Sequence, residues 1–254
     1  MLLAADIGNS HTSLGVLAGG EVVEHWRVAT NAHRTSDEWA VLLRGLTGAH
    51  ELTGIAVCST VPSVLHEWRE MLGTHFSQLR QLVVEPGVRT GIPVRMDNPR
   101  EVGTDRIINA LSAYTRFGAP AIVVDFGGTA TTFDVVNSEG HYVGGAISPG
   151  LELSLEALGR RGAQLRHVEL ARPRTVIAKN TVEALQSGMV FGVASQVEGI
   201  VSRMLAELEA EPGKANVIAT GHLAPLVIDE CACFTAHDPW LTLFGLELVF
   251  TRNS

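Results

Sequence analysis

The chain has 254 residues, and its content of 46% hydrophobic and 18% charged residues is typical of a globular protein and excludes a disordered one. The formal net charge of −8 argues against nonspecific binding to nucleic acid, which requires a basic surface. No membrane span or signal peptide is expected, because no run of about 18 apolar residues occurs and no basic region precedes Asp6.

The first half of the chain is expected to form three strands followed by alternating helices and strands. An acidic start at Ser36–Glu38 and an apolar stripe over Trp39–Leu46 predict a helix. Residues 85–98 are rich in proline and glycine and predict an irregular loop, after which a helix can begin at Pro99. Strands are expected at Leu2–Asp6, Thr12–Leu17, Glu21–Val28, Ile55–Cys58 and Gln81–Val84, and further helices from Pro62 and over Ile107–Tyr114.

The second half repeats this order. Strands are expected at Ala121–Asp125, Phe133–Val136, Tyr142–Ile147 and Asn216–Thr220, and helices over Leu151–Leu158 and from Asn180 to about Glu209. In the long helix, Gly188 and Gly192 predict a close approach of the backbone to another segment. We therefore expect an α/β fold of two duplicated lobes with mixed sheets, formed by residues 1–117 and residues 118–254.

One phrase occurs in both halves. Residues 5–13 and residues 124–132 align without a gap at a constant offset of 119, so that Asp6 matches Asp125. Both phrases have an apolar strand, an Asp, a Gly, a turn rich in hydroxyl groups and a second strand. Glycine and hydroxyl groups in such a turn can bind phosphate, and an Asp at a strand end can bind hydrated Mg²⁺. Either phrase alone could be a plain hairpin, but the recurrence favours two lobes that face each other across a nucleotide.

Four other segments allow both a functional and a structural interpretation. In Gly103–Arg106, Asp105 and Arg106 could be a base and a carboxylate-binding group, or a helix start with a local ion pair. The glycines of residues 144–150 could contact a substrate or make a tight connection. Thr181 could donate to a substrate or cap a helix, and residues 220–222 could lie near a base or form a turn.

Several common sites are excluded. No phosphate-binding loop of the GxxxxGK[ST] type, no GxGxxG after a strand and no GxSxG elbow occurs. Cys58 lies in an apolar run and is expected in the core, and Cys231 and Cys233 have no partners at zinc-binding spacing. A reducing cytoplasm is the expected location.

Taken together and in order, these segments resemble the type III pantothenate kinases. The matching residues are 6–10, 98–99 with 103–106, 129–132, 144–150, 180–181 with 186–188, 238–239, 241–243 and 245–246. The resemblance implies the acetate and sugar kinase/Hsc70/actin fold, with ribonuclease H-like, actin-like lobes. It implies transfer of the γ-phosphoryl group of ATP to the primary hydroxyl of pantothenate, which gives 4′-phosphopantothenate in the first step of coenzyme A biosynthesis. It further implies a cytoplasmic homodimer that needs Mg²⁺ and a monovalent cation, K⁺ or NH₄⁺.

The same resemblance implies a role for each matching residue. Asp105 corresponds to the catalytic base. The ATP and phosphate contacts correspond to Asp6, Gly8, Asn9, Ser10, Thr129 and Thr132. The substrate contacts correspond to Met96, Gly103, Thr104, Arg106 and Thr181, the last donated by the partner subunit. Asp6 also corresponds to the Mg²⁺ ligand, through water, and Asp125 to the ligand of the monovalent cation.

Three residues depart from the family's pattern. Gly128 is additional, Met96 stands where an aromatic residue is common, and His222 stands where a glycine is usual. The constant offset indicates that Gly128 restores the register with Asn9 of the first phrase. Two alternatives remain open at this point. One is a kinase of another small hydroxylated metabolite, and the other is an ATP-binding regulatory accessory factor of the same fold.

Overall fold

The computed structural model describes residues 1–161, 168–210 and 213–254. These residues form two compact units. Unit 1 contains Met1–Ile92, Asp97–Ser112 and Trp240–Ser254, and unit 2 contains Pro93–Met96 and Ala113–Pro239. Each unit is a set of residues that contact one another more than they contact the other unit. The predicted lobes, residues 1–117 and 118–254, follow instead from the sequence duplication. The boundary between the lobes stays a prediction.

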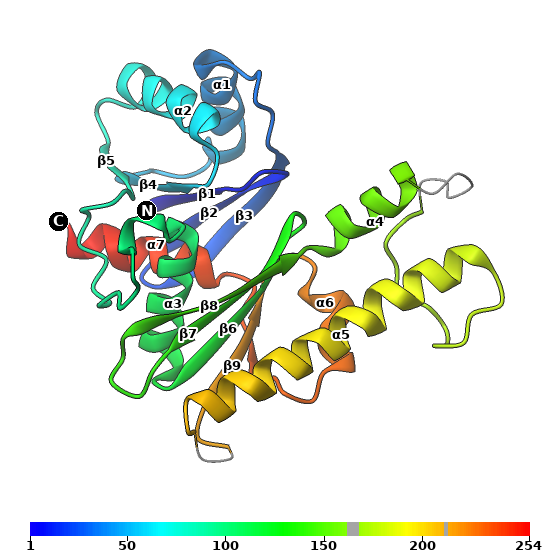
Figure 1. Ribbon diagram of the computed structural model, residues 1–254. Coiled ribbons are helices and arrows are strands. Elements are labelled where there is room, and N and C mark those ends of the chain that lie inside the picture. Colours follow the sequence, from blue (N-terminus) through cyan, green and yellow to red (C-terminus); the bar gives the residue numbers. More distant parts are fainter. Residues whose placement is uncertain (162–167, 211–212) are drawn as a thin grey trace. The chain divides into compact units, whose positions relative to one another are not determined.

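Unit 1 is built on a mixed five-stranded sheet in the order β3-β2-β1-β4-β5 (Figure 1). The central strand β1 pairs antiparallel with β2 and parallel with β4. The strands are β1 (Leu2–Ile7), β2 (His11–Ala18), β3 (Glu21–Ala29), β4 (Gly54–Ser59) and β5 (Arg80–Val83). All five predicted strands are confirmed, with ends that differ from the predicted ones by no more than one residue.

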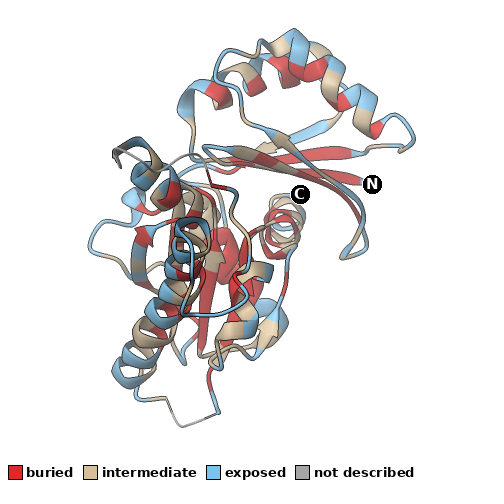
Figure 2. Ribbon diagram, turned by 90° about the vertical axis from the view of Figure 1, so that its right-hand side faces the viewer, coloured by how far each residue is buried: buried red, intermediate tan, exposed pale blue. Residues whose placement is uncertain are grey.

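Helices α1 (Ser36–Thr47) and α2 (Pro62–His75) cover one face of this sheet (Figures 1 and 2). Both predicted starts are confirmed: Thr35 caps α1 through a reciprocal pair of bonds with Glu38, and proline begins α2. Between helices and sheet lie two fully buried rings, Trp39 and Trp68, with centroids 5.2 Å apart. The apolar residues of β1 that point to this face are Leu3, Ala5 and Ile7, and the intervening Asp6 therefore points to the other face.

That other face carries α7 (Leu241–Arg252), which packs against β1, β2 and β4. A Cβ on Gly15 of β2 would lie 2.7 Å from Leu243 Cδ1, so glycine admits the helix here. Helix α3 (Thr104–Phe117) crosses α7 closely, since a Cβ on Gly245 would lie 2.6 Å from the carbonyl oxygen of Ile108. The helix expected from Pro99 is only a short 3₁₀ turn, Pro99–Glu101, and α3 begins later, at Thr104.

Unit 2 repeats the arrangement with a sheet in the order β10-β9-β6-β7-β8. Its strands are β6 (Ala121–Phe126), β7 (Ala130–Val136), β8 (Tyr142–Pro149), β9 (Asn216–Thr220) and β10 (Ala236–His237). Its helices are α4 (Leu151–Arg161), α5 (Thr181–Glu207) and α6 (Ala224–Val227), followed by a 3₁₀ turn, Ile228–Glu230. Residues of α4, α5 and α6 form one hydrophobic core with β6, β7 and β9.

The register of the strands confirms the duplication. Asp6 lies opposite Ser13 of β2, and Asp125 lies opposite Thr132 of β7, which preserves the offset of 119. Strands β1 and β6 also share the same order of buried residues, with only the Asp partly exposed. Gly128 therefore keeps the two phrases in register, as predicted.

The prediction for the two glycines of α5 is wrong within the described residues. A Cβ on Gly188 or Gly192 would meet nothing within 4 Å, so no described segment approaches the helix backbone there. In the part of the chain that the structure describes, no helix is both long and apolar enough to cross a membrane.

Candidate functional site

The predicted site residues of unit 1 gather where β1 and β4 end. These strands run parallel, and their register puts Asp6 opposite Cys58. Beyond Asp6 the chain turns into β2, and the turn is closed by the Gly8 N–H, which donates to the His11 carbonyl at 3.0 Å. Asn9 and Ser10 are exposed at its tip. Because the ends of parallel strands are where α/β sheets bind ligands, this position suits the predicted phosphate contacts.

The first turn of α3 holds the predicted base. Asp105 Oδ1 and Thr104 Oγ1 are both buried and have no hydrogen-bond partner among the described residues. Gly103 leaves room for the carboxylate, since a Cβ there would lie 2.5 Å from Asp105 Oδ1. Two unpaired oxygens at one helix start are costly unless a ligand bonds to them, so this turn has the features of a binding site.

Burial raises the pKa of Asp105 above its ordinary value. The N–H and the guanidinium charge of Arg106, and the N–H of Asp105 itself, act in the opposite direction because each stabilises the carboxylate. Arg106 therefore supports the ionised form of Asp105, but burial is the larger effect.

Cys58 is close enough to Asp6 and to Asp105 for the charges of both carboxylates to act on it. Its thiol is fully buried and donates a hydrogen bond to Asp6 Oδ1 at 3.3 Å. Burial raises the pKa of this thiol well above its ordinary value, and the charges of Asp6 and Asp105 raise it further. The sequence predicted the burial of Cys58 but missed its neighbours, which only the pairing of β1 with β4 reveals.

The matching turn of unit 2 lies at the end of β6. Asp125 stands opposite Thr132 of β7 and Thr220 of β9. Thr132 Oγ1 donates to the buried Asp134 at 3.2 Å, and the Thr129 carbonyl accepts from Gly150 N at 2.9 Å. The glycine-rich end of β8 thus holds the second turn in place, which supports a structural role for the segment of residues 144–150.

Glu152, in the first turn of α4, contacts this turn, and the sequence did not reveal it. Its carboxylate packs against Gly128, where a Cβ would lie 3.0 Å from Glu152 Cδ. The same carboxylate approaches His222 Nε2 at 3.5 Å. Two of the three departures from the family's pattern, Gly128 and His222, therefore meet at one side chain.

Met96 and Thr181 also belong to unit 2. Met96 lies against β8, with its sulfur 3.1 Å from where a Cβ on Gly144 would stand. Thr181 is the exposed first residue of α5, and the cap is Asn180, whose side chain accepts from Glu183 N at 2.9 Å. The predicted residues are thus divided between the units: Asp6–Ser10 and Gly103–Arg106 lie in unit 1, and Met96, Asp125, Thr129, Thr132 and Thr181 lie in unit 2.

In sequence, this chain is similar to type III pantothenate kinases. The family model described as type III pantothenate kinase matches residues 2–203. A type III pantothenate kinase from a Nocardioides species is 72% identical, over 100% of this chain and 99% of the relative. The chain belongs to the type III pantothenate kinase family.

Solved structures confirm the fold. A ROK family glucokinase from Streptomyces griseus, in complex with glucose and AMPPNP, superposes with a TM-score of 0.53 at 12% identity, covering 96% of this chain and 97% of that one. A protein from Campylobacter jejuni described as a Baf family transcriptional activator gives 0.60 at 18% identity, covering 99% and 98%. At such identities the likeness concerns the fold alone, an α/β fold of two actin-like lobes.

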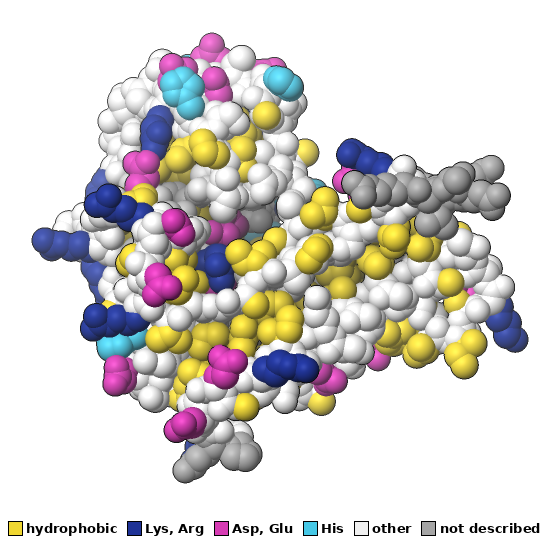
Figure 3. All heavy atoms as spheres, viewed as in Figure 1, with side chains coloured by type: hydrophobic (Ala, Val, Ile, Leu, Met, Phe, Trp, Pro, Cys, Tyr) yellow, Lys and Arg dark blue, Asp and Glu magenta, His cyan; other side chains and the backbone are white. Residues whose placement is uncertain are grey.

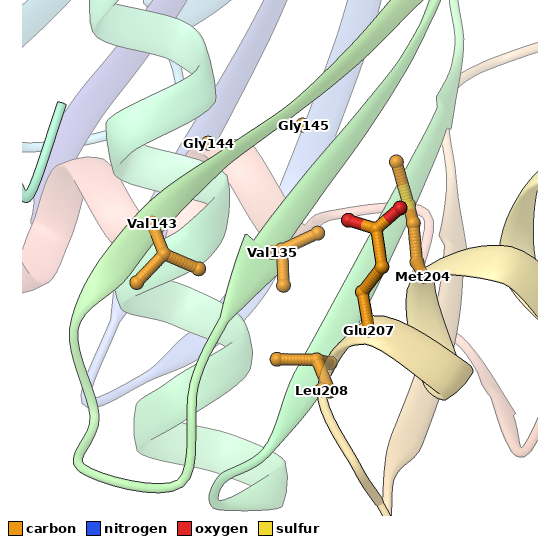
Figure 4. Close-up of a pocket in the computed structure, with 7 residues that line it drawn as sticks. All are labelled: Val135, Val143, Gly144, Gly145, Met204, Glu207 and Leu208. Carbon is orange, nitrogen blue, oxygen red and sulfur yellow. The ribbon is translucent and has the colours of Figure 1, made fainter. Parts of the chain in front are cut away.

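Unit 2 of this type III pantothenate kinase family member contains a cavity of about 220 Å³ (Figure 4). Strands β7 and β8 and the C-terminal end of α5 surround it, and the Glu207 carboxylate points toward the strands. Its lining residues are Val135, Val143, Gly144, Gly145, Met204, Glu207 and Leu208. Gly144 and Gly145 belong to the segment 144–150 that the sequence singled out, but the resemblance to the family assigns no role to any of the lining residues.

Proposed function

We propose that this chain phosphorylates the primary hydroxyl of pantothenate with ATP, giving 4′-phosphopantothenate in the first step of coenzyme A biosynthesis. Membership of the type III pantothenate kinase family supports the reaction and its acceptor. Because ATP is used inside cells, the proposal also places the enzyme in the cytoplasm.

The observation that carries the proposal is the pair of unpaired oxygens at the start of α3. Asp105 Oδ1 and Thr104 Oγ1 are buried without a partner, beside the N–H groups of a helix terminus. A primary hydroxyl could donate to Asp105 and accept from Thr104. Asp105 would then take the hydroxyl proton as the oxygen attacks phosphorus, and Arg106 would hold the acceptor through its carboxylate.

The two turns suit the phosphates of ATP. Asn9 and Ser10 are exposed at the tip of the first turn, and Thr129 lies partly exposed in the second. Asp6 is a hard oxygen donor at a strand end, which fits a hydrated magnesium ion shared with phosphate oxygens. Bound there, Mg²⁺ would neutralise phosphate charge, while the turns donate hydrogen bonds to the oxygens on which charge develops.

We assign the monovalent cation, K⁺ or NH₄⁺, to Asp125. This residue occupies the place in unit 2 that Asp6 occupies in unit 1, at the end of the central strand and partly exposed. The resemblance to the family supports the assignment. Activity should therefore be higher in K⁺ than in Na⁺, and equal rates in both salts would refute the assignment of the cation to Asp125.

We also propose a homodimer in which Thr181 contacts the acceptor bound by the partner subunit. Hydrophobic side chains gather on one face of unit 2 over β8 and α5 (Figure 3). The exposed hydrophobic residues of this unit include Ile147 of β8, Leu153 of α4 and Val182 of α5. Gly188 and Gly192 of α5 are open to an approaching chain. An apolar face with open glycines beside Thr181 is what a dimer would cover.

The test is an ADP-release assay with pantothenate, with and without K⁺, on the wild-type chain and on Asp105→Asn. We expect K⁺-stimulated release that the variant loses by about 10²-fold or more with little change in pantothenate affinity. Release with another hydroxylated metabolite alone would favour the second kinase hypothesis. ATP binding without release for any acceptor would favour the accessory factor.

A further inference from the structure

We propose that Cys58 is a positioning residue, whose thiol holds the Asp6 carboxylate in the orientation that binds the magnesium–nucleotide complex. The inference deepens the proposed function and rests on it for the role of Asp6. It concerns a residue that composition and spacing had assigned to the core.

The first support is the contact itself. Strands β1 and β4 are parallel and in register at Asp6 and Cys58, so the two side chains lie next to each other on the same face of the sheet. The thiol donates to Asp6 Oδ1 at 3.3 Å. With Oδ1 engaged by the thiol, rotation of the carboxylate is restricted.

The second support is the face on which Cys58 lies. The neighbouring Ile55 and Val57 point into the core under α1 and α2, whereas Cys58 is not part of that core. It faces Asp6 and lies close enough to Asp105 for both charges to act on it. If Cys58 only filled space, any small apolar side chain could replace it. The thiol, however, is a hydrogen-bond donor with a specific partner, the Asp6 carboxylate.

The third support is the duplication. In unit 2 the residue opposite Asp125 on the neighbouring parallel strand is Thr220, which is buried like Cys58. Both units therefore put a buried side chain that can donate hydrogen beside the Asp at the end of the central strand. The thiol is the weaker donor of the two.

The test compares three substitutions of Cys58. Cys58→Ala and Cys58→Val remove the donor at two different volumes, and Cys58→Ser keeps one. The control is Val57→Ala, which shortens a buried side chain of the same strand on the opposite face. Calorimetry measures the binding of a non-hydrolysable ATP analogue with and without Mg²⁺, and thermal unfolding reports on the fold.

We expect the alanine and valine variants to bind the magnesium complex about tenfold more weakly, the lower end of the loss caused by removing an outer-shell partner of a metal ligand. Serine should remain within about threefold of wild type. Binding of the analogue without Mg²⁺ should be unchanged in all three. Val57→Ala should lower thermal stability without a change in the effect of Mg²⁺.

The proposal would be overturned if Cys58→Ala or Cys58→Val bound the magnesium complex with wild-type affinity. It would also be overturned if Cys58→Ser bound the complex as weakly as Cys58→Ala does. If one of these variants does not fold, the other still decides. A wild-type chain that binds the magnesium complex but does not phosphorylate pantothenate would refute the proposed function alone. A wild-type chain that binds no magnesium complex would refute both.

Discussion

Substitution of Gly221 by alanine tests whether the second turn depends on close packing around Asp125. Gly221 has φ of +87°, and a Cβ there would lie 2.7 Å from both N and C of Phe126 and still closer to Asp125 Oδ1. Two costs therefore act at one residue. The backbone must adopt a left-handed conformation with a side chain, and the new methyl group must displace main-chain atoms of β6.

The left-handed conformation costs about 1–2 kcal/mol for a residue with a Cβ, and overpacking costs about 1–3 kcal/mol more. We expect Gly221→Ala to lose about 2–5 kcal/mol of unfolding free energy. Gly118 is the matched control, because its φ is +86° and a Cβ there would meet nothing within 4 Å. Gly118→Ala should lose only about 1–2 kcal/mol.

Urea unfolding of the two variants and the wild-type chain gives the free energies, and ADP release in K⁺ and Na⁺ gives the functional effect. Gly221→Ala should also lose stimulation by K⁺, because Asp125 is displaced, whereas Gly118→Ala should retain it. Equal destabilisation of the two variants would refute the steric argument. Full K⁺ stimulation in Gly221→Ala would refute the link between this packing and the cation.

Three further predictions concern unit 1. Burial raises the pKa of Asp105, so as the pH is lowered kcat/KM should begin to fall earlier, at a higher pH, than it would for a base with the ordinary pKa of Asp. A pH profile whose acid limb matches an ordinary Asp would contradict this. The folded state penalises the ionised carboxylate, so Asp105→Asn should raise the Tm at pH 7. The effect should disappear below the ordinary pKa of Asp, and thermal unfolding at two pH values would measure it. Cys58 should resist a thiol-alkylating reagent until the chain unfolds, since it is buried and protonated, whereas the half-buried Cys233 should react in the native protein. Mass spectrometry of the modified peptides distinguishes the two cysteines. Rapid labelling of Cys58 in the native protein would contradict its burial.

The strands and the duplication could be read from the sequence because their signals are local. Continuous apolar runs end at Asp6 and Asp125, and the turn residues follow directly, so position along the chain was enough. Helix α7 was missed for the opposite reason. Apolar residues lie on nearly every side of it, which leaves no amphipathic stripe to detect. Its burial depends on β1 and α3, both far away in sequence.

The candidate site was predictable only in part. The resemblance to the family pointed to Asp105 and to the turn residues, but no sequence pattern joins Cys58 to Asp6 or Glu152 to Gly128. Those contacts arise from strand pairing and from the start of α4, and they involve residue types that fill cores and surfaces elsewhere. The roles assigned to individual site residues stay predictions until the variants above are measured.

The position of α7 has a consequence for the order in which the chain acquires its structure. This helix covers one face of the unit 1 sheet, yet it follows all of unit 2 in sequence. During synthesis β1, β2 and β4 can pair early, but the face with Gly15 and Asp6 stays uncovered until the ribosome has passed Leu241. Unit 2, which ends at Pro239, can be completed first. A nascent chain would therefore finish its N-terminal sheet last, and a ribosome that stalls before α7 would leave that sheet open to aggregation.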